Sequence, residues 1–341
     1  MKNLNIIDKL VFLINSVVAV LLLLSYGLSY VPPNIFSFLS VLSLSVPLLI
    51  ILNIAFGVYW LVKLKKQLLL SVLVLLLGYN YILSFYKFST VTVSSESGFS
   101  LMSYNVRLFN LYDWIDEPDI PQKIQNFLLE KSPSVLCFQE YDSSTDLNFK
   151  SYSYSYFTAN SSRYSSKLAI FSKHQIVSSG TIDFPDSSNN AIFADIIFKS
   201  DTIRVYNLHL QSSGINPNVE TLDSKQSNKL LSRLGVTFKA QQHQAELVAS
   251  HMSKSPYKAL LCGDFNNTIY SYVYRILKSE MLDAFEEAGT GFGRTFKFKY
   301  FPFRIDFILA DPGIKVGKFS SFNELPYSDH FPIMSEFTLE D

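Results

Sequence analysis

The chain has 341 residues, of which 48% are hydrophobic and only 17% charged, so it is too apolar to be one ordinary soluble domain. Six of the 29 Lys and Arg residues and two of the 29 Asp and Glu residues lie before residue 98, so a cationic, apolar head precedes a body with 23 cationic and 27 acidic residues, net −4. The 15% aromatic content, 13 glycines and two cysteines exclude a disordered chain, a collagen and a disulfide scaffold.

Three uncharged apolar runs at the start of the chain have the length of membrane spans, at about 10–30, 35–62 and 68–86. A cleaved signal peptide is an alternative for the first run, and buried helices of a soluble protein are another. No small-residue cleavage pattern follows the first run, however, and two further runs do. We therefore expect residues 1–90 to form a membrane anchor of three transmembrane helices, 91–98 a linker, and 99–341 a globular domain.

The lysines of the anchor predict its orientation, because Lys and Arg accumulate in short cytoplasmic loops. Lys2 and Lys9 flank the first span, and Lys63, Lys65 and Lys66 lie between the second and third spans. The turn between the first two spans carries no charge. The N-terminus and the lysine loop should therefore face the cytoplasm, and three crossings should place the body outside it.

Beyond the linker, apolar runs rich in β-branched and aromatic residues predict strands. They are 99–104, 134–138, 168–171, 191–198, 203–210, 258–262 and 305–310. Helical periodicity appears at 120–129, 224–252 and 272–277, and the polar tracts 143–166 and 212–228 are expected to be surface loops. Strands outnumber helices and do not alternate strictly with them, which favours an α/β body with sheet packed on sheet and helices outside.

Polar side chains that suit catalysis collect at the ends of these runs, which share one rim if the strands lie side by side. They are Asn105, Glu140, His209, Asp264, Asn266, Asp306, Asp329 and His330. The set lacks a nucleophile, because the chain has no Gly-x-Ser-x-Gly and neither cysteine has a cationic setting. Attack by water assisted by a metal fits better, with Mg²⁺ preferred because it takes carboxylate oxygen and keeps several waters.

The order of these residues resembles the endonuclease/exonuclease/phosphatase superfamily, over essentially all of residues 99–338. The segments that carry the resemblance are Ser103-Tyr104-Asn105-Val106-Arg107, Phe138-Gln139-Glu140, Lys167-Leu168-Ala169-Ile170-Phe171-Ser172, Asn207-Leu208-His209-Leu210-Gln211-Ser212, Gly263-Asp264-Phe265-Asn266, Arg304-Ile305-Asp306 and Ser328-Asp329-His330. Single segments are weak signals, but their order is specific. The resemblance implies a four-layer α/β sandwich, two packed β-sheets flanked by helices, as the catalytic domain.

The resemblance also implies a metal site. Glu140 would be the main metal carboxylate, Asn105 would hold the metal shell and the phosphate, and Asp329 would be a second acid near the metal. The expected ion is Mg²⁺, with Mn²⁺ as a substitute. Arg107 stands where some nuclease branches carry an acid, which puts a second metal on that strand in doubt.

The remaining residues would carry the chemistry of an in-line displacement by water. Asp264 would orient or deprotonate the water, and Asn266 and His209 would donate hydrogen bonds to the non-bridging phosphate oxygens. Asp306 and His330 would pair, so that the carboxylate fixes the tautomer of the imidazole ring.

The resemblance thus implies a divalent-metal-dependent phosphoester hydrolase. Together with the predicted spans and their orientation, it indicates an enzyme anchored in a bacterial plasma membrane with its catalytic domain extracytoplasmic. Its partners would be the lipid bilayer and a phosphoester substrate. Nuclease-type cleavage is the commonest use of the family, although the body lacks the basic footprint of duplex binding. Single strands could stack on the aromatic tract Tyr152, Tyr154, Tyr156 and Phe157. The alternatives are a phospholipid head-group phosphodiesterase or phosphatase, favoured by the tether, and a non-catalytic membrane-tethered binding module.

Overall fold

Apolar helices form the first part of the chain. The computed structural model describes residues 4–88, 98–145, 147–158, 167–214, 224–299 and 301–339, without the side chains of 224–228, so all but the last residue of the expected linker lies outside the described residues. The helices are α1 (Ile6–Ser25), η1 (Leu28–Tyr30), α2 (Ser37–Leu42), η2 (Ser43–Ser45), α3 (Val46–Val62), α4 (Leu68–Leu77) and α5 (Tyr79–Phe85). The stretches Ile6–Tyr30 and Ser37–Val62 are long and apolar enough to cross a membrane.

The third expected span is not a straight helix, because α4 and α5 are bent by 75° relative to each other. The bend lies at Gly78, against which the ring of Tyr26 packs so closely that a Cβ there would lie 2.0 Å from the Tyr26 hydroxyl oxygen. That hydroxyl donates a hydrogen bond to the Val74 carbonyl, 3.0 Å away, in the last turn of α4. The close approach of Tyr26 thus needs a residue without a side chain at the bend.

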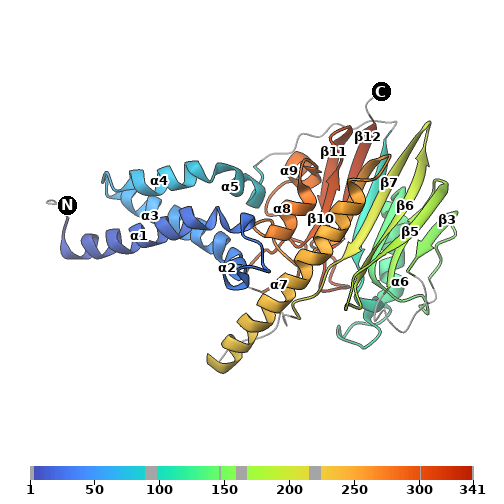
Figure 1. Ribbon diagram of the computed structural model, residues 1–341, viewed down its shortest axis with the longest axis horizontal. Helices are drawn as coiled ribbons and strands as arrows, with labels where there is room; N and C mark the ends of the chain where they lie inside the picture. The colour runs from blue at the N-terminus through green and yellow to red at the C-terminus, as the bar shows by residue number, and fades with distance from the viewer. Residues whose placement is uncertain are drawn as a thin grey trace.

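Buried polar side chains join the apolar helices to one another. The Asn15 amide nitrogen donates to the Ser71 hydroxyl at 2.9 Å, and the Trp60 indole nitrogen donates to the Asn15 oxygen at 2.9 Å. An ion pair between Asp8 and Lys63 joins the start of α1 to the end of α3. The start of α1 and the turn between α3 and α4 lie together at the end of the helices farthest from the strands (Figure 1).

Among the residues that the structure describes, two six-stranded sheets form the body of the chain. The first has the order β11 (Ile314–Ser321), β12 (Ile333–Leu339), β1 (Phe99–Asn105), β2 (Val135–Tyr141), β4 (Lys167–Ser172) and β3 (Tyr154–Phe157). The second has the order β5 (Ile176–Asp183), β6 (Asn190–Phe198), β7 (Asp201–His209), β8 (Lys258–Asp264), β10 (Asp306–Ala310) and β9 (Leu282–Asp283).

The sheets pack face to face, and helices cover their outer faces (Figure 1). Apolar side chains of both sheets, such as Leu101 and Cys137 from the first and Val205 and Cys262 from the second, fill the space between them. On the outer faces, α6 (Ile120–Lys131) packs on the first sheet, and α7 (Ser224–Met252) and α8 (Tyr272–Lys278) pack on the second. The short elements η3 (Arg107–Asn110) and α9 (Ala284–Ala288) complete the body. The predicted α/β sandwich is confirmed.

The two polar tracts that were expected to be surface loops contain regular secondary structure in part. The first, 143–166, contains the strand β3, and the second, 212–228, ends in the first turn of α7. The prediction missed β3 because, among the described strands, it pairs only with β4 at the edge of the sheet. Tyr and Ser residues there replace an apolar pattern. The prediction also missed four other strands, β5, β9, β11 and β12. The outward faces of β5, β11 and β12 are polar, and β9 has only two residues.

The apolar helices are docked on the body through α7 and α8. The backbone nitrogen of Asn34 donates to the side-chain oxygen of Gln242 at 2.8 Å, and the Arg275 guanidinium donates to the Ser29 carbonyl at 2.8 Å. In addition to these hydrogen bonds, Val41 of α2 makes apolar contacts with Leu234 and Phe238 of α7. The middle of α7, from Leu234 to Gln242, is therefore the part of this helix that contacts the apolar helices and the turn before them.

Candidate active site

The register of neighbouring strands brings the predicted polar residues to one rim. In the second sheet His209 pairs with Asp264 across the parallel strands β7 and β8, and Asp264 pairs with Asp306 across the antiparallel strands β8 and β10. In the first sheet Asn105 pairs with Gln139, the residue before Glu140. Because each residue ends or begins its strand at the same edge, their side chains converge where the two sheets meet.

Gly263 allows the second sheet to place Asp264 at this rim. Its φ is +136°, and a Cβ at this position would lie 2.0 Å from the Leu208 carbonyl oxygen of β7. Any other residue would therefore push β8 away from β7 just before Asp264.

Glu140 points into the site because β2 is irregular there. The register of β2 against β4 shifts between Phe138 and Tyr141, and Glu140 has a φ of +50°. The Asn105 amide donates to Glu140 Oε1 at 3.2 Å, while Oε2 has no hydrogen-bond partner among the described residues. Burial raises the pKa of Glu140, although His330 and the Asn105 hydrogen bond oppose the shift. A desolvated carboxylate with a free oxygen is suited to bind a cation.

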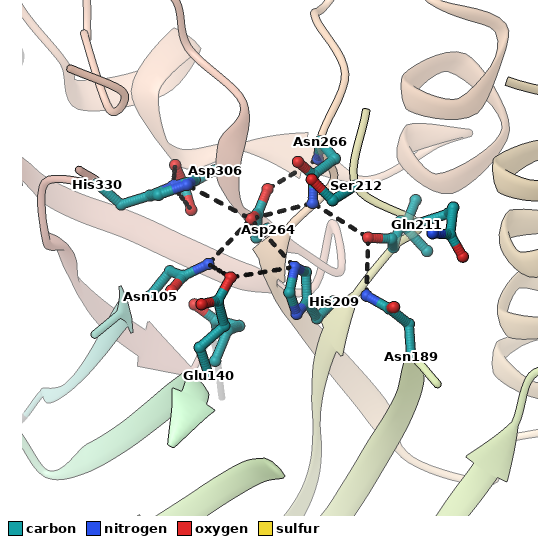
Figure 2. A network of polar contacts seen from close by, with 12 residues as sticks. Asn105, Glu140, Asn189, His209, Gln211, Ser212, Asp264, Asn266, Asp306 and His330 are labelled. Carbon is teal, nitrogen blue, oxygen red and sulfur yellow. Dashed lines mark hydrogen bonds and ion pairs between the residues drawn. The ribbon is translucent and has the colours of Figure 1, made fainter. Parts of the chain in front are cut away.

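Asp264 lies at the centre of the polar network (Figure 2). Its Oδ1 accepts a hydrogen bond from the Asn266 backbone nitrogen at 2.8 Å, and its Oδ2 accepts from the side-chain amides of Asn105 at 3.1 Å and Asn266 at 3.2 Å. The Nε2 atoms of His209 and His330 lie 3.5 Å and 3.7 Å from Oδ2. Burial raises the pKa of Asp264 to about 6, against the opposing effect of His330. Asp264 is therefore a stronger base than an exposed carboxylate.

Asp306 and His330 form the expected pair. The His330 Nδ1 lies 2.9 Å from Asp306 Oδ2, and both side chains are buried. Burial by itself lowers the pKa of His330, but the carboxylates of Asp306 and Asp264 outweigh it and raise that pKa well above its usual value. The ring is thus held with Nδ1 toward Asp306 and Nε2 toward Asp264.

The same three residues, Asp264, Asp306 and His330, have ligand atoms within 4.8 Å of one another and could hold a metal ion. A metal needs an unprotonated ring nitrogen, and the two carboxylates stabilise a proton on His330, so a metal would compete with that proton. The predicted group of Glu140, Asn105 and Asp329 contains no histidine, and its Asp329 is paired with Arg107.

His209 presents an unsatisfied polar atom to the site. Its Nε2 is buried and has no hydrogen-bond partner among the described residues, although it lies 3.9 Å from Glu140 Oε1. Burial lowers the pKa of His209, so the ring is neutral at neutral pH. Such a nitrogen is available to donate to a phosphate oxygen if the proton resides on Nε2.

The side-chain amide of Asn266 already donates hydrogen bonds within the protein. Its side-chain amide donates to the Leu210 carbonyl at 3.0 Å as well as to Asp264. Donation to a phosphate would need one of these bonds to be exchanged. The next residue, Asn267, donates to Gln241 of α7 at 2.8 Å, and Gln241 in turn donates to the Asn266 carbonyl at 3.2 Å. Asn267 therefore positions the loop that carries Asn266.

Asp329, the residue before His330, lines the cavity and is paired with Arg107. Its Oδ2 is 3.4 Å from the Arg107 Nε, and the Arg107 guanidinium lies over the Trp114 ring, 4.5 Å from its centroid. Ser328, which the sequence showed only as part of a motif, donates from its hydroxyl to the Asn105 carbonyl at 2.8 Å. Ser328 thus ties the segment of Asp329 and His330 to the end of β1.

Thr295 was not anticipated, and Arg304 lies outside the site. The Thr295 hydroxyl accepts from the Asp306 backbone nitrogen at 3.1 Å and so fixes the start of β10. Arg304 is buried and donates to Asp283 at 2.6 Å and to the Ser84 carbonyl of α5 at 3.2 Å. It balances charge and holds α5 on the body, and it does not line the cavity of the site.

The site opens into a cavity of about 620 Å³, a size typical of ligand sites. Five of the predicted residues line it: Glu140, Asp264, Asn266, Asp329 and His330. The structure therefore brings the predicted residues of both sheets to one cavity, with Asn105, His209 and Asp306 directly behind or beside it.

Comparison with known proteins identifies two parts of the chain. Residues 102–330 match the model of the endonuclease/exonuclease/phosphatase family, and residues 8–85 match a domain of unknown function. No curated protein matches the chain.

Several solved structures share the fold of the body. An endonuclease/exonuclease/phosphatase family protein from Bacteroides thetaiotaomicron has 18% identity and a TM-score of 0.56, covering 73% of this chain and 100% of its own. TDP2 from D. rerio, complexed with single strand DNA product, has 18% identity and a TM-score of 0.54, covering 71% of this chain and 100% of its own. The mannosyl-6-phosphatase of B. thetaiotaomicron has 19% identity and a TM-score of 0.50, with the same coverage.

Proposed function

The chain belongs to the endonuclease/exonuclease/phosphatase family of phosphoester hydrolases, and from that premise we propose that it is a membrane-anchored, Mg²⁺-dependent hydrolase that uses water as its nucleophile. The observation that carries the proposal is the position of Asp264. Its buried carboxylate lies within 3.7 Å of the Nε2 atoms of both His209 and His330, on the floor of the cavity. A base and two hydrogen-bond donors around one point are what an attack on phosphorus requires.

Glu140 would hold the metal, with Asn105 and Asp329 completing the protein's share of the shell. The fit is supported by the free oxygen of Glu140 and by the burial that raises its pKa, because a bound cation would relieve that unfavourable charge. Mg²⁺, or Mn²⁺ in its place, would supply Lewis-acid polarisation of a phosphoryl oxygen.

The residues of the chain would then act in a single displacement. Asp264, ionised at neutral pH because its pKa is about 6, accepts a proton from water as the water oxygen attacks phosphorus and the bond to the leaving oxygen breaks. His209 and His330 donate from Nε2 to the phosphoryl oxygens, where negative charge develops. Asp306 stabilises the proton on the His330 ring and holds the ring in this orientation.

The test uses the full chain in detergent and a generic aryl phosphodiester. Hydrolysis should require Mg²⁺ or Mn²⁺, should stop in excess chelator and should return when the metal is restored. Full activity in excess chelator would reject the mechanism. Nucleic acid, the substrate class favoured by the sequence, and lipid head groups both satisfy this chemistry, so the choice depends on the walls of the cavity.

We also propose that residues 1–90 anchor the protein and that the body lies outside the cytoplasm. The support is the lysine distribution together with the arrangement of the helices, in which the start of α1 and the turn between α3 and α4 lie away from the body (Figure 1). If the bent pair α4 and α5 crosses the membrane as one broken span, three crossings separate the lysines from the body.

A further inference from the structure

The cavity extends well beyond the catalytic residues, and most of that extension is apolar. Its apolar lining comes from the segment before β10, from α7 and from η2, through Phe296, Phe298, Phe303, Leu230, Leu234 and Leu44. We call this part the apolar groove. Such a wall is suited to an apolar part of a substrate, because burying apolar surface is favourable.

The apolar groove leads from the catalytic residues to the apolar helices. Leu44 lies in η2, inside the second stretch that is long enough to cross a membrane, Ser37–Val62. Next to it, Val41 of α2 packs against Leu234 and Phe238 of α7. One end of the groove is therefore formed by the part of the chain expected to contact the bilayer, and the other by Asp264 and His330.

The first half of α7 has the character of a helix that lies at a membrane surface. Figure 1 shows it passing beside α2 and projecting beyond the sandwich. Leu231 and Val236 are 41% and 67% exposed, and Lys229 and Arg233 are exposed and line the cavity. Exposed apolar residues interleaved with cations are typical of interfacial helices and favour anionic lipid.

Features that would favour a nucleic acid are weaker. The aromatic tract that was expected to stack bases does not line the cavity, and two of its rings, Tyr152 and Phe157, pack against Phe171 with centroids 6.1 Å and 5.2 Å away. The body has a net charge of −4. The lining cations lie instead on α7, beside the apolar groove.

We propose that the substrate is a membrane lipid phosphoester whose phosphate reaches the catalytic residues while its hydrocarbon chain occupies the apolar groove. The inference rests on the proposed hydrolase function and specifies its substrate class. The hydrocarbon passes from the bilayer to the groove without exposure to water, and Lys229 and Arg233 attract the anionic head group. The catalytic domain thus acts on the membrane that anchors it.

The first experiment compares substrates with the full chain reconstituted in phosphatidylcholine nanodiscs with Mg²⁺. Phosphatidylglycerol tests a diester and phosphatidic acid a monoester, each with dioleoyl or dihexanoyl chains, and a single-stranded DNA oligonucleotide and the aryl phosphodiester are run alongside. We expect kcat/KM for one of the dioleoyl lipids to exceed that for its dihexanoyl form and that for DNA by at least about tenfold, because only the long chain fills the groove. Faster hydrolysis of DNA than of any lipid would overturn the proposal.

The second experiment compares variants that line the cavity with variants that do not. Leu230→Ser and Arg233→Gln alter residues that line the cavity, whereas Val177→Ser, at an exposed position of β5, and Lys239→Gln, on α7, alter residues that do not. The lining variants should lower kcat/KM for the long-chain lipid by about tenfold, mainly through KM, and the control variants should keep the wild-type value. Equal effects of the lining variants and their controls would contradict a lipid in the groove.

A binding measurement separates this inference from the hydrolase function. A long-chain lipid phosphonate that cannot be hydrolysed is added to the full chain in detergent with chelator, and retention is read by native mass spectrometry. Retention that Leu230→Ser weakens and Val177→Ser does not supports the groove even if no substrate is cleaved, in which case the hydrolase function alone fails. Cleavage of the aryl phosphodiester without lipid retention would leave the hydrolase function standing and overturn the lipid proposal.

Discussion

Replacing Asp264 with Asn changes both a hydrogen-bond network and a buried charge, and the structure gives the size of each effect. Oδ1 of Asp264 accepts from the Asn266 backbone nitrogen at 2.8 Å, so the oxygen of the new amide would keep that place. Its NH₂ group would then replace Oδ2, to which the amides of Asn105 and Asn266 donate at 3.1 Å and 3.2 Å. A donor facing two donors in a buried site should cost about 1–3 kcal/mol.

The loss of the charge acts in the opposite direction. Burial raises the pKa of Asp264 to about 6, whereas an unfolded Asp has a pKa of about 4. The folded state therefore binds the proton more tightly, and the cost of ionising Asp264 appears as pH rises from about 4 to 6 and is complete above pH 6. Two pKa units correspond to a loss of about 3 kcal/mol in the free energy of unfolding. The Asn variant does not lose this stability because its side chain does not ionise.

Asp264→Asn should therefore be less stable than wild type near pH 4 and as stable or more stable above pH 7, measured by thermal unfolding in metal-free detergent solution. At pH 7.5 and saturating Mg²⁺, its hydrolysis of the aryl phosphodiester should be slower by about 10² to 10⁴, the usual contribution of a positioned base. Asp201→Asn, an exposed change at the start of β7, should show neither effect. A folded Asp264→Asn protein that hydrolyses at the wild-type rate would refute the assignment of the base.

Glu140→Gln should raise the Mg²⁺ concentration needed for half-maximal rate and recover part of its rate at high Mg²⁺, because it loses a charged ligand but keeps its volume; an unchanged metal titration would point to another principal ligand. Arg304→Met should lower the free energy of unfolding by about 3–5 kcal/mol because Asp283 loses its buried partner, while KM stays at the wild-type value; a raised KM with normal stability would instead place the guanidinium on the substrate. A reporter fused at Gln67 should be cytoplasmic and one fused after Asp341 extracytoplasmic, and the reverse labelling would disprove the proposed orientation.

The membrane-span candidates and the residues of the candidate site could be predicted from the sequence because both depend on short segments. Apolar length alone marks Ile6–Tyr30 and Ser37–Val62. Polar residues at the ends of apolar runs converge because strands in register bring their ends to one edge, as His209, Asp264 and Asp306 do. The resemblance to the family then predicts two packed β-sheets flanked by helices, whereas the order of the strands is known only from the structure.

Other features depend on residues far apart in the chain, and only the tertiary structure shows them. The bend at Gly78 exists because Tyr26 packs against it, and Arg304 is withdrawn from the site because Asp283 accepts its hydrogen bond.

The apolar groove is the clearest case, because Leu44 belongs to η2 and Leu230 to α7, and these two elements are far apart in the sequence. The sequence thus determined which chemistry the rim of the sheets can support, since that chemistry follows from residue type and strand end. The packing of α7 against α2 decided what lies beside the rim, since such contacts form only when the whole chain has folded.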